Sequence, residues 1–460
     1  MGPRRTSRCA LAALCCLLAF GTGAAVADAA KRKAIARELD RLYARGAIDQ
    51  ATYDADRAIH RDVKRTIRRL TGARRVELAG VLATVERIAA RGSLRASRLY
   101  PLFLTLDRNR EWWSTQALLA SGQRVTFEDS ELVWQYVPGQ GLQLHPLANF
   151  GKLNAYAKSR YRRIQNAQLL DELMAVAVPR GGGLAWEYYF DFGGGKPPWV
   201  SSLSQGTALQ AVARSAAKLG RMAELLPAIQ RGLTLFEQKP PTGVRVATDA
   251  GAHYVQYSFW PRLRVINGFV QSLVGLYDVA QITGDARAAQ LFGDGDRAAR
   301  VEVPRFDTGA WSLYSRDAIT RESDLHYHTL LRDFLASLCD RTAVRVYCAA
   351  ESHFTSYLTV PPVVALRTTR LRGGKPGALR FSLSKISSAT VRVIAPDGRT
   401  VLSSSAGVVG RGTRYVTWNV PRKPGLYTAQ VDATDLAGNP ASAQGVVEVR
   451  KPKRRKRGAK

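Results

Sequence analysis

Three tyrosines lie in polar segments beside predicted helix starts, where a phenol can either pack or exchange a proton. They are Tyr257, Tyr314 and Tyr327. A phenol has a pKa of about 10, so a tyrosine that acts as a base needs a cationic neighbour to hold its phenolate form. Spacing alone does not separate packing from chemistry at these positions, and a more specific pattern is needed.

The sequence contains none of the common nucleotide, hydrolase or metalloprotease motifs. There is no Walker loop, no dinucleotide-binding glycine fingerprint, no G-x-S-x-G and no H-E-x-x-H. The six histidines form no ligand set. His326 and His328 flank Tyr327, and on a helix their side chains would point about 200° apart. We therefore expect neither a metal site nor a cofactor.

The candidate tyrosines fall in loops between segments with helical periodicity. The predicted helical stretches lie near 147–176, 203–236, 265–290 and 325–340. The loops 180–195 and 250–264 are rich in aromatic residues, and the first is also rich in glycine. Helix pairs joined by long loops favour an α/α toroid, mainly α, whose loops line a cleft. We assign this domain to residues 123–355.

The regions on either side of this domain have a different character. Residues 28–122 are rich in Ala, Arg, Leu and Glu with an amphipathic period, which predicts an N-terminal helical region. Residues 124–136 alternate around a polar turn, as a small β-hairpin insertion would. Short alternating strands between turn signals over 360–450 predict an immunoglobulin-like β-sandwich.

The N-terminus predicts export. A basic head, a short apolar run and an Ala25-Val26-Ala27 site are typical of a secretory signal peptide covering residues 1–27. Cleavage would leave Cys339 and Cys348, which we expect to form one disulfide in a secreted protein. No later stretch is long and apolar enough for a membrane span.

The net charge of +31 favours anionic partners. Residues 451–460 hold seven Lys or Arg and predict a disordered basic tail, which would suit an anionic cell-wall polymer. We expect no nucleic-acid partner, because a leader is present and no basic helix has base-reading spacing.

Five blocks in one order are the most specific pattern in the chain. They are Gln140–Gly151, Trp199–Leu209, Asn267–Asp278, Asp307–Tyr314 and Tyr327–Thr329. The third block reads N-G-F-V-Q-S-L-V-G-L-Y-D. Together the blocks resemble the D-glucuronyl C5-epimerase family over roughly residues 130–350.

This resemblance implies a set of site residues. The family's catalytic tyrosines fall on Tyr257, Tyr314 and Tyr327, and Gln256 stands where the family has an acidic residue. The expected substrate-binding residues are Glu187, Trp199, Gln205, Arg262, Arg264, Asn267, Arg316 and His328.

The implied reaction inverts C5 of uronic acid units in a polysaccharide. A proton is removed next to a carboxylate and one is returned on the opposite face, so each face needs a proton-transfer group. Tyr257 and Tyr327 would serve opposite faces and Tyr314 would assist. An arginine would pair with the substrate carboxylate, because the intermediate carries extra negative charge there.

Three other functions remain open from the sequence. A polysaccharide lyase would share the same carbanion and toroid. A non-catalytic binder would use the cleft, the sandwich and the tail to hold anionic glycans. A glycoside hydrolase would need two positioned carboxylates, for which Glu187, Asp191 and Asp307 are available, with Glu187 in an aromatic setting that suits sugar stacking.

Overall fold

A computed structural model describes residues 34–452 of the chain. The predicted signal peptide and residues 453–460 of the basic tail lie outside the described residues. The chain divides into two units: residues up to 247 with 254–261 and 275–293, and residues 248–253 and 262–274 with those from 294 onward.

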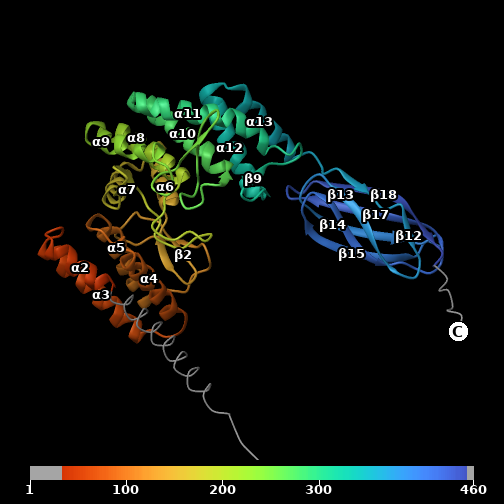
Figure 1. Ribbon diagram of the computed structural model, residues 1–460, viewed down its shortest axis with the longest axis horizontal. Helices are drawn as coiled ribbons and strands as arrows, with labels where there is room; N and C mark the ends of the chain where they lie inside the picture. Colours follow the sequence, from red (N-terminus) through yellow and green to blue (C-terminus); the bar gives the residue numbers. More distant parts are fainter. Residues whose placement is uncertain (1–33, 453–460) are drawn as a thin grey trace, which may run out of the picture. The chain divides into compact units, whose positions relative to one another are not determined.

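Helices make up most of the described chain before residue 358 (Figure 1). They are α2 (Ala34–Ala44), α3 (Gln50–Arg69), α4 (Gly72–Ala90), α5 (Ala96–Thr115), α6 (Pro146–Lys158), α7 (Arg163–Ala175), α8 (Ser202–Leu219), α9 (Met222–Leu233), η1 (Thr234–Phe236), α10 (Ile266–Thr283), α11 (Ala286–Glu302), η2 (Val303–Phe306), α12 (Leu325–Thr342) and α13 (Arg345–Tyr357).

The four N-terminal helices α2 to α5 pack around a shared apolar core. In α2 the buried residues Ile35, Leu39 and Leu42 recur at helical spacing and face this core. Asp49 caps α3 by accepting a hydrogen bond from the Thr52 amide at 2.8 Å. From residue 34 onward these helices agree with the predicted N-terminal helical region, whose assignment as a domain stays a prediction.

The predicted helical stretches after residue 146 form pairs joined by short turns. Within the first unit, α6 is followed by α7 and α8 by α9, and α8 ends at Gly220 with φ +75°, a left-handed conformation that suits glycine. Within the second unit, α12 is followed by α13. The helical pairs are confirmed, and their closure into an α/α toroid stays a prediction.

Strands occur as short local sheets before residue 323 and as longer runs after 363. They are β1 (Arg124–Val125), β2 (Trp134–Val137), β3 (Gly141–Leu144), β4 (Val178–Arg180), β5 (Gly183–Ala185), β6 (Arg245–Thr248), β7 (Gly251–Tyr254), β8 (Leu263–Val265), β9 (Leu313–Asp317), β10 (Arg321–Glu322), β11 (Val364–Leu366), β12 (Arg370–Arg372), β13 (Pro376–Leu383), β14 (Ser387–Ile394), β15 (Thr400–Val409), β16 (Gly412–Asn419), β17 (Gly425–Asp435) and β18 (Pro440–Arg450).

The insertion at 124–144 is larger than the predicted hairpin. It forms a three-stranded sheet in the order β1-β2-β3. The extra strand β3 lies in a segment rich in turn residues, but the buried side chain of Asn109 in α5 binds both polar groups of Leu142, each at 2.7 Å. These two hydrogen bonds join residues far apart in sequence, so a local pattern could not predict the strand.

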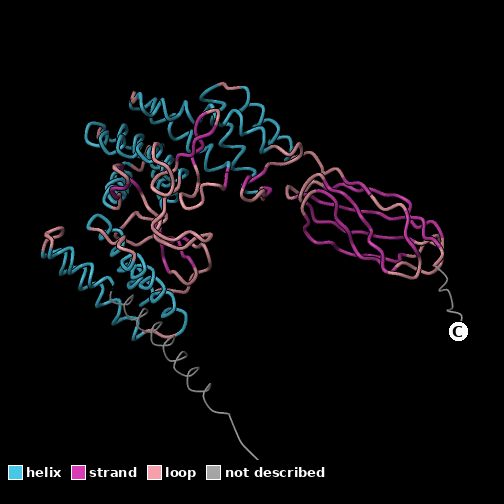
Figure 2. The backbone as a smooth tube through the Cα atoms, viewed as in Figure 1, coloured by secondary structure: helices cyan, strands magenta, loops and turns pink. Residues whose placement is uncertain are grey.

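The C-terminal part consists of two sheets that share one core (Figure 2). The sheets have the orders β11-β13-β16 and β12-β18-β17-β14-β15. Alternate residues of both sheets are buried, including Phe381, Val391, Trp418 and Val431. The two-sheet packing agrees with the predicted sandwich, whereas its immunoglobulin-like character stays a prediction.

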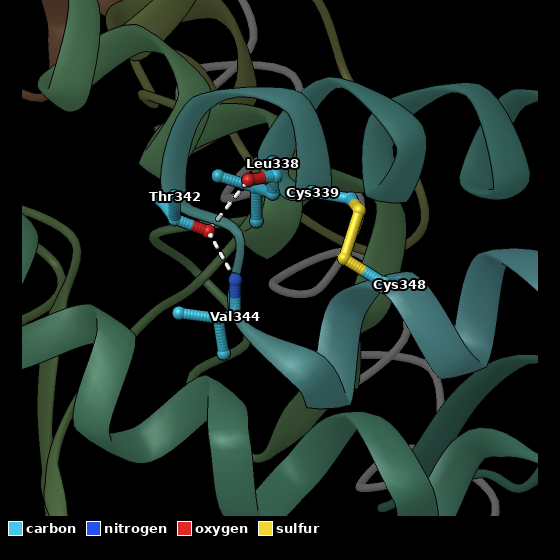
Figure 3. Close-up of a disulfide and its surroundings, with 5 residues drawn as sticks. All are labelled: Leu338, Cys339, Thr342, Val344 and Cys348. Carbon is cyan, nitrogen blue, oxygen red and sulfur yellow. Dashed lines mark hydrogen bonds between the residues drawn. A yellow bond between two sulfur atoms is a disulfide. The ribbon is translucent and has the colours of Figure 1, made fainter.

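Cys339 of α12 and Cys348 of α13 are bonded, with Cα atoms 4.9 Å apart (Figure 3). The turn between the two helices is fixed further by Thr342, whose hydroxyl donates to the Leu338 carbonyl at 2.6 Å and accepts from the Val344 amide at 3.3 Å. The disulfide favoured from the sequence is therefore present.

Across residues 34–452, none of the helices combines the length and the apolar character that a membrane crossing requires.

Candidate active site

A three-stranded antiparallel sheet of the second unit carries Tyr314 and two of the expected arginines. β9 pairs with β8 on one side and with β10 on the other. In this register Arg264 of β8 stands directly opposite Arg316 of β9. Because side chains alternate along a strand, Tyr314 and Arg316 point to the same face. Both arginines and Tyr314 therefore share one face of the sheet.

Tyr314 and Tyr327 are brought together by β9 and the first turn of α12. Their ring centroids are 4.7 Å apart. Asp324 caps α12 by accepting a hydrogen bond from the Tyr327 amide at 2.8 Å. Asn267 in the first turn of α10 donates from Nδ2 to the Tyr327 carbonyl at 3.0 Å. Hydrogen bonds thus hold both backbone groups of Tyr327, while the residue stays 37% exposed.

The surroundings of Tyr327 favour its protonated form. Burial raises the pKa of the Tyr327 phenol above its usual value, and negative charge on Tyr314 or Asp324 would raise it further, whereas Arg321 opposes these effects. Tyr327 therefore holds its proton at neutral pH, which suits a proton donor.

Tyr257 lies in the first unit, within a cluster of aromatic side chains. Its ring centroid is 5.5 Å from that of Phe192, 6.0 Å from that of Trp199 and 5.4 Å from that of Phe259. Gln256 donates from Nε2 to the Tyr257 hydroxyl at 2.9 Å. An amide donor at this position stabilises negative charge on the phenol oxygen, as a proton acceptor requires.

The three expected arginines differ in their surroundings. Arg264 lies with Nε 3.5 Å from a carboxylate oxygen of Asp317. Arg316 donates to the Arg305 carbonyl and lies over the Phe306 ring, 5.8 Å from its centroid. Arg262 is exposed. Arg264 and Arg316 lie within the strands and share the face that carries Tyr314, whereas Arg262 precedes β8.

Glu187 is part of a buried ion-pair network of the first unit. Arg98 binds its two carboxylate oxygens at 2.7 and 2.8 Å, and Arg180 lies 2.5 Å from one of them. Burial opposes ionisation, but the two arginines outweigh it and hold the pKa of the Glu187 carboxyl below its usual value. The Glu187 side chain is fully buried, so its ion pairs stabilise the loop 180–195.

Gln205 and Trp199 also make structural contacts within the first unit. Gln205 is buried and donates from Nε2 to the carbonyls of Leu184 and Gly232. Trp199 stacks on Tyr188 with centroids 4.1 Å apart and donates to a backbone carbonyl. Both residues support the loops that hold the aromatic cluster around Tyr257.

His328 is buried in the second unit and has partners on both ring nitrogens. Nδ1 lies 2.8 Å from the Ser312 hydroxyl and Nε2 lies 2.9 Å from the Phe354 carbonyl, while the ring stacks on Trp311 at 3.6 Å. Burial lowers the pKa of His328 to about 4. The ring is neutral at pH 7 and anchors the segment that leads into β9.

Sequence patterns do not single out the groups that lie beside Arg264. Glu302, at the end of α11, binds buried His253 with Nδ1 and Oε2 2.7 Å apart. Burial opposes ionisation of Glu302, but His253, Arg264 and Arg305 outweigh it and hold the pKa of the carboxyl below its usual value. His253 and Glu302 are far apart in sequence and belong to no motif, so only the fold pairs them.

The segment that contains all three tyrosines also matches a known family. Residues 181–356 match the family model described as D-glucuronyl C5-epimerase C-terminus. This segment is similar to the C5-epimerase family. The family resemblance is thereby confirmed over residues 181–356, which contain four of the five sequence blocks and the three expected catalytic tyrosines. The block Gln140–Gly151 lies before this range.

Two curated relatives cover only parts of the chain. A D-glucuronyl C5-epimerase of Caenorhabditis elegans is 30% identical over 26% of this chain and 21% of its own length. An uncharacterised protein of Methanocaldococcus jannaschii is 31% identical over 18% of this chain and 26% of its own length. The chain thus spans about a fifth to a quarter of the length of these relatives.

Two solved structures of sugar epimerases are similar at a low level. A cellobiose 2-epimerase from Bacillus thermoamylovorans aligns with TM-score 0.38 and 12% identity, and a sugar epimerase from a ruminal bacterium with TM-score 0.40 and 8% identity. Each alignment covers 62% of this chain and 74% of the other. Both TM-scores are below 0.5, so we draw no conclusion about the fold or function of this chain from them.

Proposed function

We propose that the protein inverts C5 of uronic acid units in a polysaccharide. The observation that carries the proposal is the Tyr314–Tyr327 pair inside the segment that matches the epimerase family. Tyr314 shares one face of its sheet with Arg264 and Arg316, which supply positive charge for uronate carboxylates.

The reaction needs a proton acceptor and a proton donor and no change in oxidation state. The acceptor takes the C5 proton, and the electron pair of the broken C–H bond delocalises into the neighbouring carboxylate. The donor then forms a new C5–H bond on the opposite face, and the electron pair returns to carbon. An arginine beside the carboxylate stabilises the added charge of the intermediate.

The surroundings of the tyrosines support one division of these roles. Tyr327 is protonated and partly exposed, which suits the donor. The Gln256 amide donates to Tyr257, which suits the acceptor because the charged phenolate keeps that hydrogen bond. Tyr314 contacts the Tyr327 ring and orients it.

The proposal includes export, an α/α toroid that carries the site, and an immunoglobulin-like sandwich that follows it in the sequence. A basic head, an apolar run and an A-x-A site support export. Repeated helical pairs support the toroid, and two sheets around one core support the sandwich.

Product analysis tests this proposal against its alternatives. The full mature chain is incubated with a glucuronate-containing polysaccharide, and the product is read by NMR and by ultraviolet absorbance. We expect iduronate signals without absorbance from an unsaturated uronate. An unsaturated product would identify a lyase, and an unchanged polymer that binds tightly would identify a non-catalytic binder.

A further inference from the structure

A small cavity of about 200 Å³ opens beside the arginine pair of the second unit. The turn between β6 and β7, the end of α11, η2 and the strands β8 and β9 line it. Its charged side chains are Asp249, Arg264, Glu302, Arg305, Arg316 and Asp317. Pockets for drug-sized ligands measure roughly 300–1,000 Å³, so the size suits about one sugar ring.

Arg264 has a buried nitrogen that lacks an acceptor. Its Nη1 is buried and makes no hydrogen bond. Its Nε lies 3.5 Å from a carboxylate oxygen of Asp317, whose side chain is 60% exposed, so this ion pair is weak. An unpaired buried donor is unfavourable, so an acceptor that reaches the Arg264 guanidinium from the cavity would be favourable.

The cavity presents both signs of charge. The carboxylate of Glu302 already accepts from His253 at 2.7 Å, whereas Asp249 is exposed. Guanidinium groups suit a carboxylate, and carboxylates accept hydrogen bonds from hydroxyl groups. A uronic acid unit carries both kinds of group, so it matches this lining better than an inorganic anion does.

The cavity is linked to the tyrosine pair by one strand. Arg316 and Tyr314 are two residues apart on the same face of β9, a rise of about 7 Å. We propose that the cavity binds the carboxylate of a uronic acid unit near the reacting one, with Arg264 as the principal contact. The inference rests on the proposed function for the identity of its ligand.

Binding measurements on the full mature chain test the subsite without relying on turnover. The probe is a fluorescent hexasaccharide of alternating glucuronate and N-acetylglucosamine, compared with the same oligosaccharide after reduction of its carboxyl groups. We expect Arg264→Gln to raise the Kd of the acidic probe at least ten-fold and to leave that of the reduced probe unchanged. Arg264→Lys keeps the charge but loses the planar fork, so it should fall between.

The matched control is Arg297→Gln on α11. Arg297 pairs with Asp294, its side chain is 61% exposed, and it does not line the cavity. Unchanged binding of the acidic probe by Arg264→Gln would overturn the inference, as would equal losses for both probes at an unchanged unfolding temperature. A chain that binds as expected but does not epimerise would contradict the proposed function and leave the subsite standing.

Discussion

At the residue scale, the proposed chemistry depends on two tyrosine hydroxyls with different surroundings. Tyr327 lies where burial and nearby negative charge favour the protonated phenol. Tyr257 receives a hydrogen bond from Gln256, which occupies the position of the family's acidic residue. A carboxylate at this position could only accept a hydrogen bond, whereas the Gln256 amide donates one. In the proposed mechanism this donor stabilises negative charge on the Tyr257 oxygen.

Tyr327→Phe removes the proposed proton donor but keeps the ring that contacts Tyr314. We expect kcat to fall by about 10²–10⁴, the range for loss of general acid catalysis, with little change in KM. Steady-state conversion of a glucuronate polymer measures this. A variant with the kcat of the wild type would rule out Tyr327 as the donor.

Gln256→Leu removes the amide that donates to Tyr257. A hydrogen bond to a charged group contributes about 1.5–3 kcal/mol, so we expect kcat to fall by about ten-fold or more. The rate–pH profile should also move to higher pH, because the phenolate is less stabilised. Gln256→Asn, which retains an amide, serves as the comparison, and equal profiles for all three proteins would contradict the assignment.

At the element scale, α12 is the helix that connects the site to its support. Its first turn presents Tyr327, its buried His328 anchors the segment before β9, and its last turn is bonded to α13 through Cys339. Loss of the His328 contacts or of the disulfide should lower the free energy of unfolding more than it changes kcat.

His328 predicts a stability loss in mild acid. Burial lowers its pKa to about 4 from a usual value near 6.5, so the unfolded chain binds more protons between these values. The free energy of unfolding should therefore fall by about 3 kcal/mol as pH drops from 6.5 to 4. Denaturant unfolding of wild type and His328→Gln measures the difference, and identical pH slopes would contradict the prediction.

The Cys339–Cys348 disulfide closes a short loop between α12 and α13. Loop-closure entropy for a loop of this length amounts to about 2–3 kcal/mol. We expect the double variant Cys339→Ser, Cys348→Ser to lose about that much free energy of unfolding in urea. Treatment of the wild type with a reductant should produce the same loss, and a stable reduced protein would count against this contribution.

At the scale of the whole molecule, local patterns predict the helices well. The stretches predicted from 147, 203, 265 and 325 begin at Pro146, Ser202, Ile266 and Leu325. Amphipathic periods and alternating strands are local properties, so a single sequence reveals them. The two-sheet core after residue 363 follows from the same kind of signal.

Long-range partners could not be predicted in this way. Arg98 and Glu187 pair across 89 residues, and Arg264 meets Arg316 only because β8 and β9 adopt one register. Sequence patterns favour Glu187 as a substrate contact, and only the folded chain reveals its two arginine partners. Tyr314 and Tyr327 lie in the ordered motif blocks and Tyr257 lies ten residues before the third block, whereas the cavity at Arg264 follows from the fold alone.

Solvent deuterium incorporation at C5 is the most direct test of the central claim. The full mature chain is incubated with a glucuronate polymer in D₂O, and C5 is monitored by NMR, with Tyr327→Phe run in parallel. We expect deuterium at C5 in both glucuronate and iduronate units with the wild type, and a loss of exchange into iduronate with the variant. No deuterium at C5 across uronic acid polymers of different composition would contradict it.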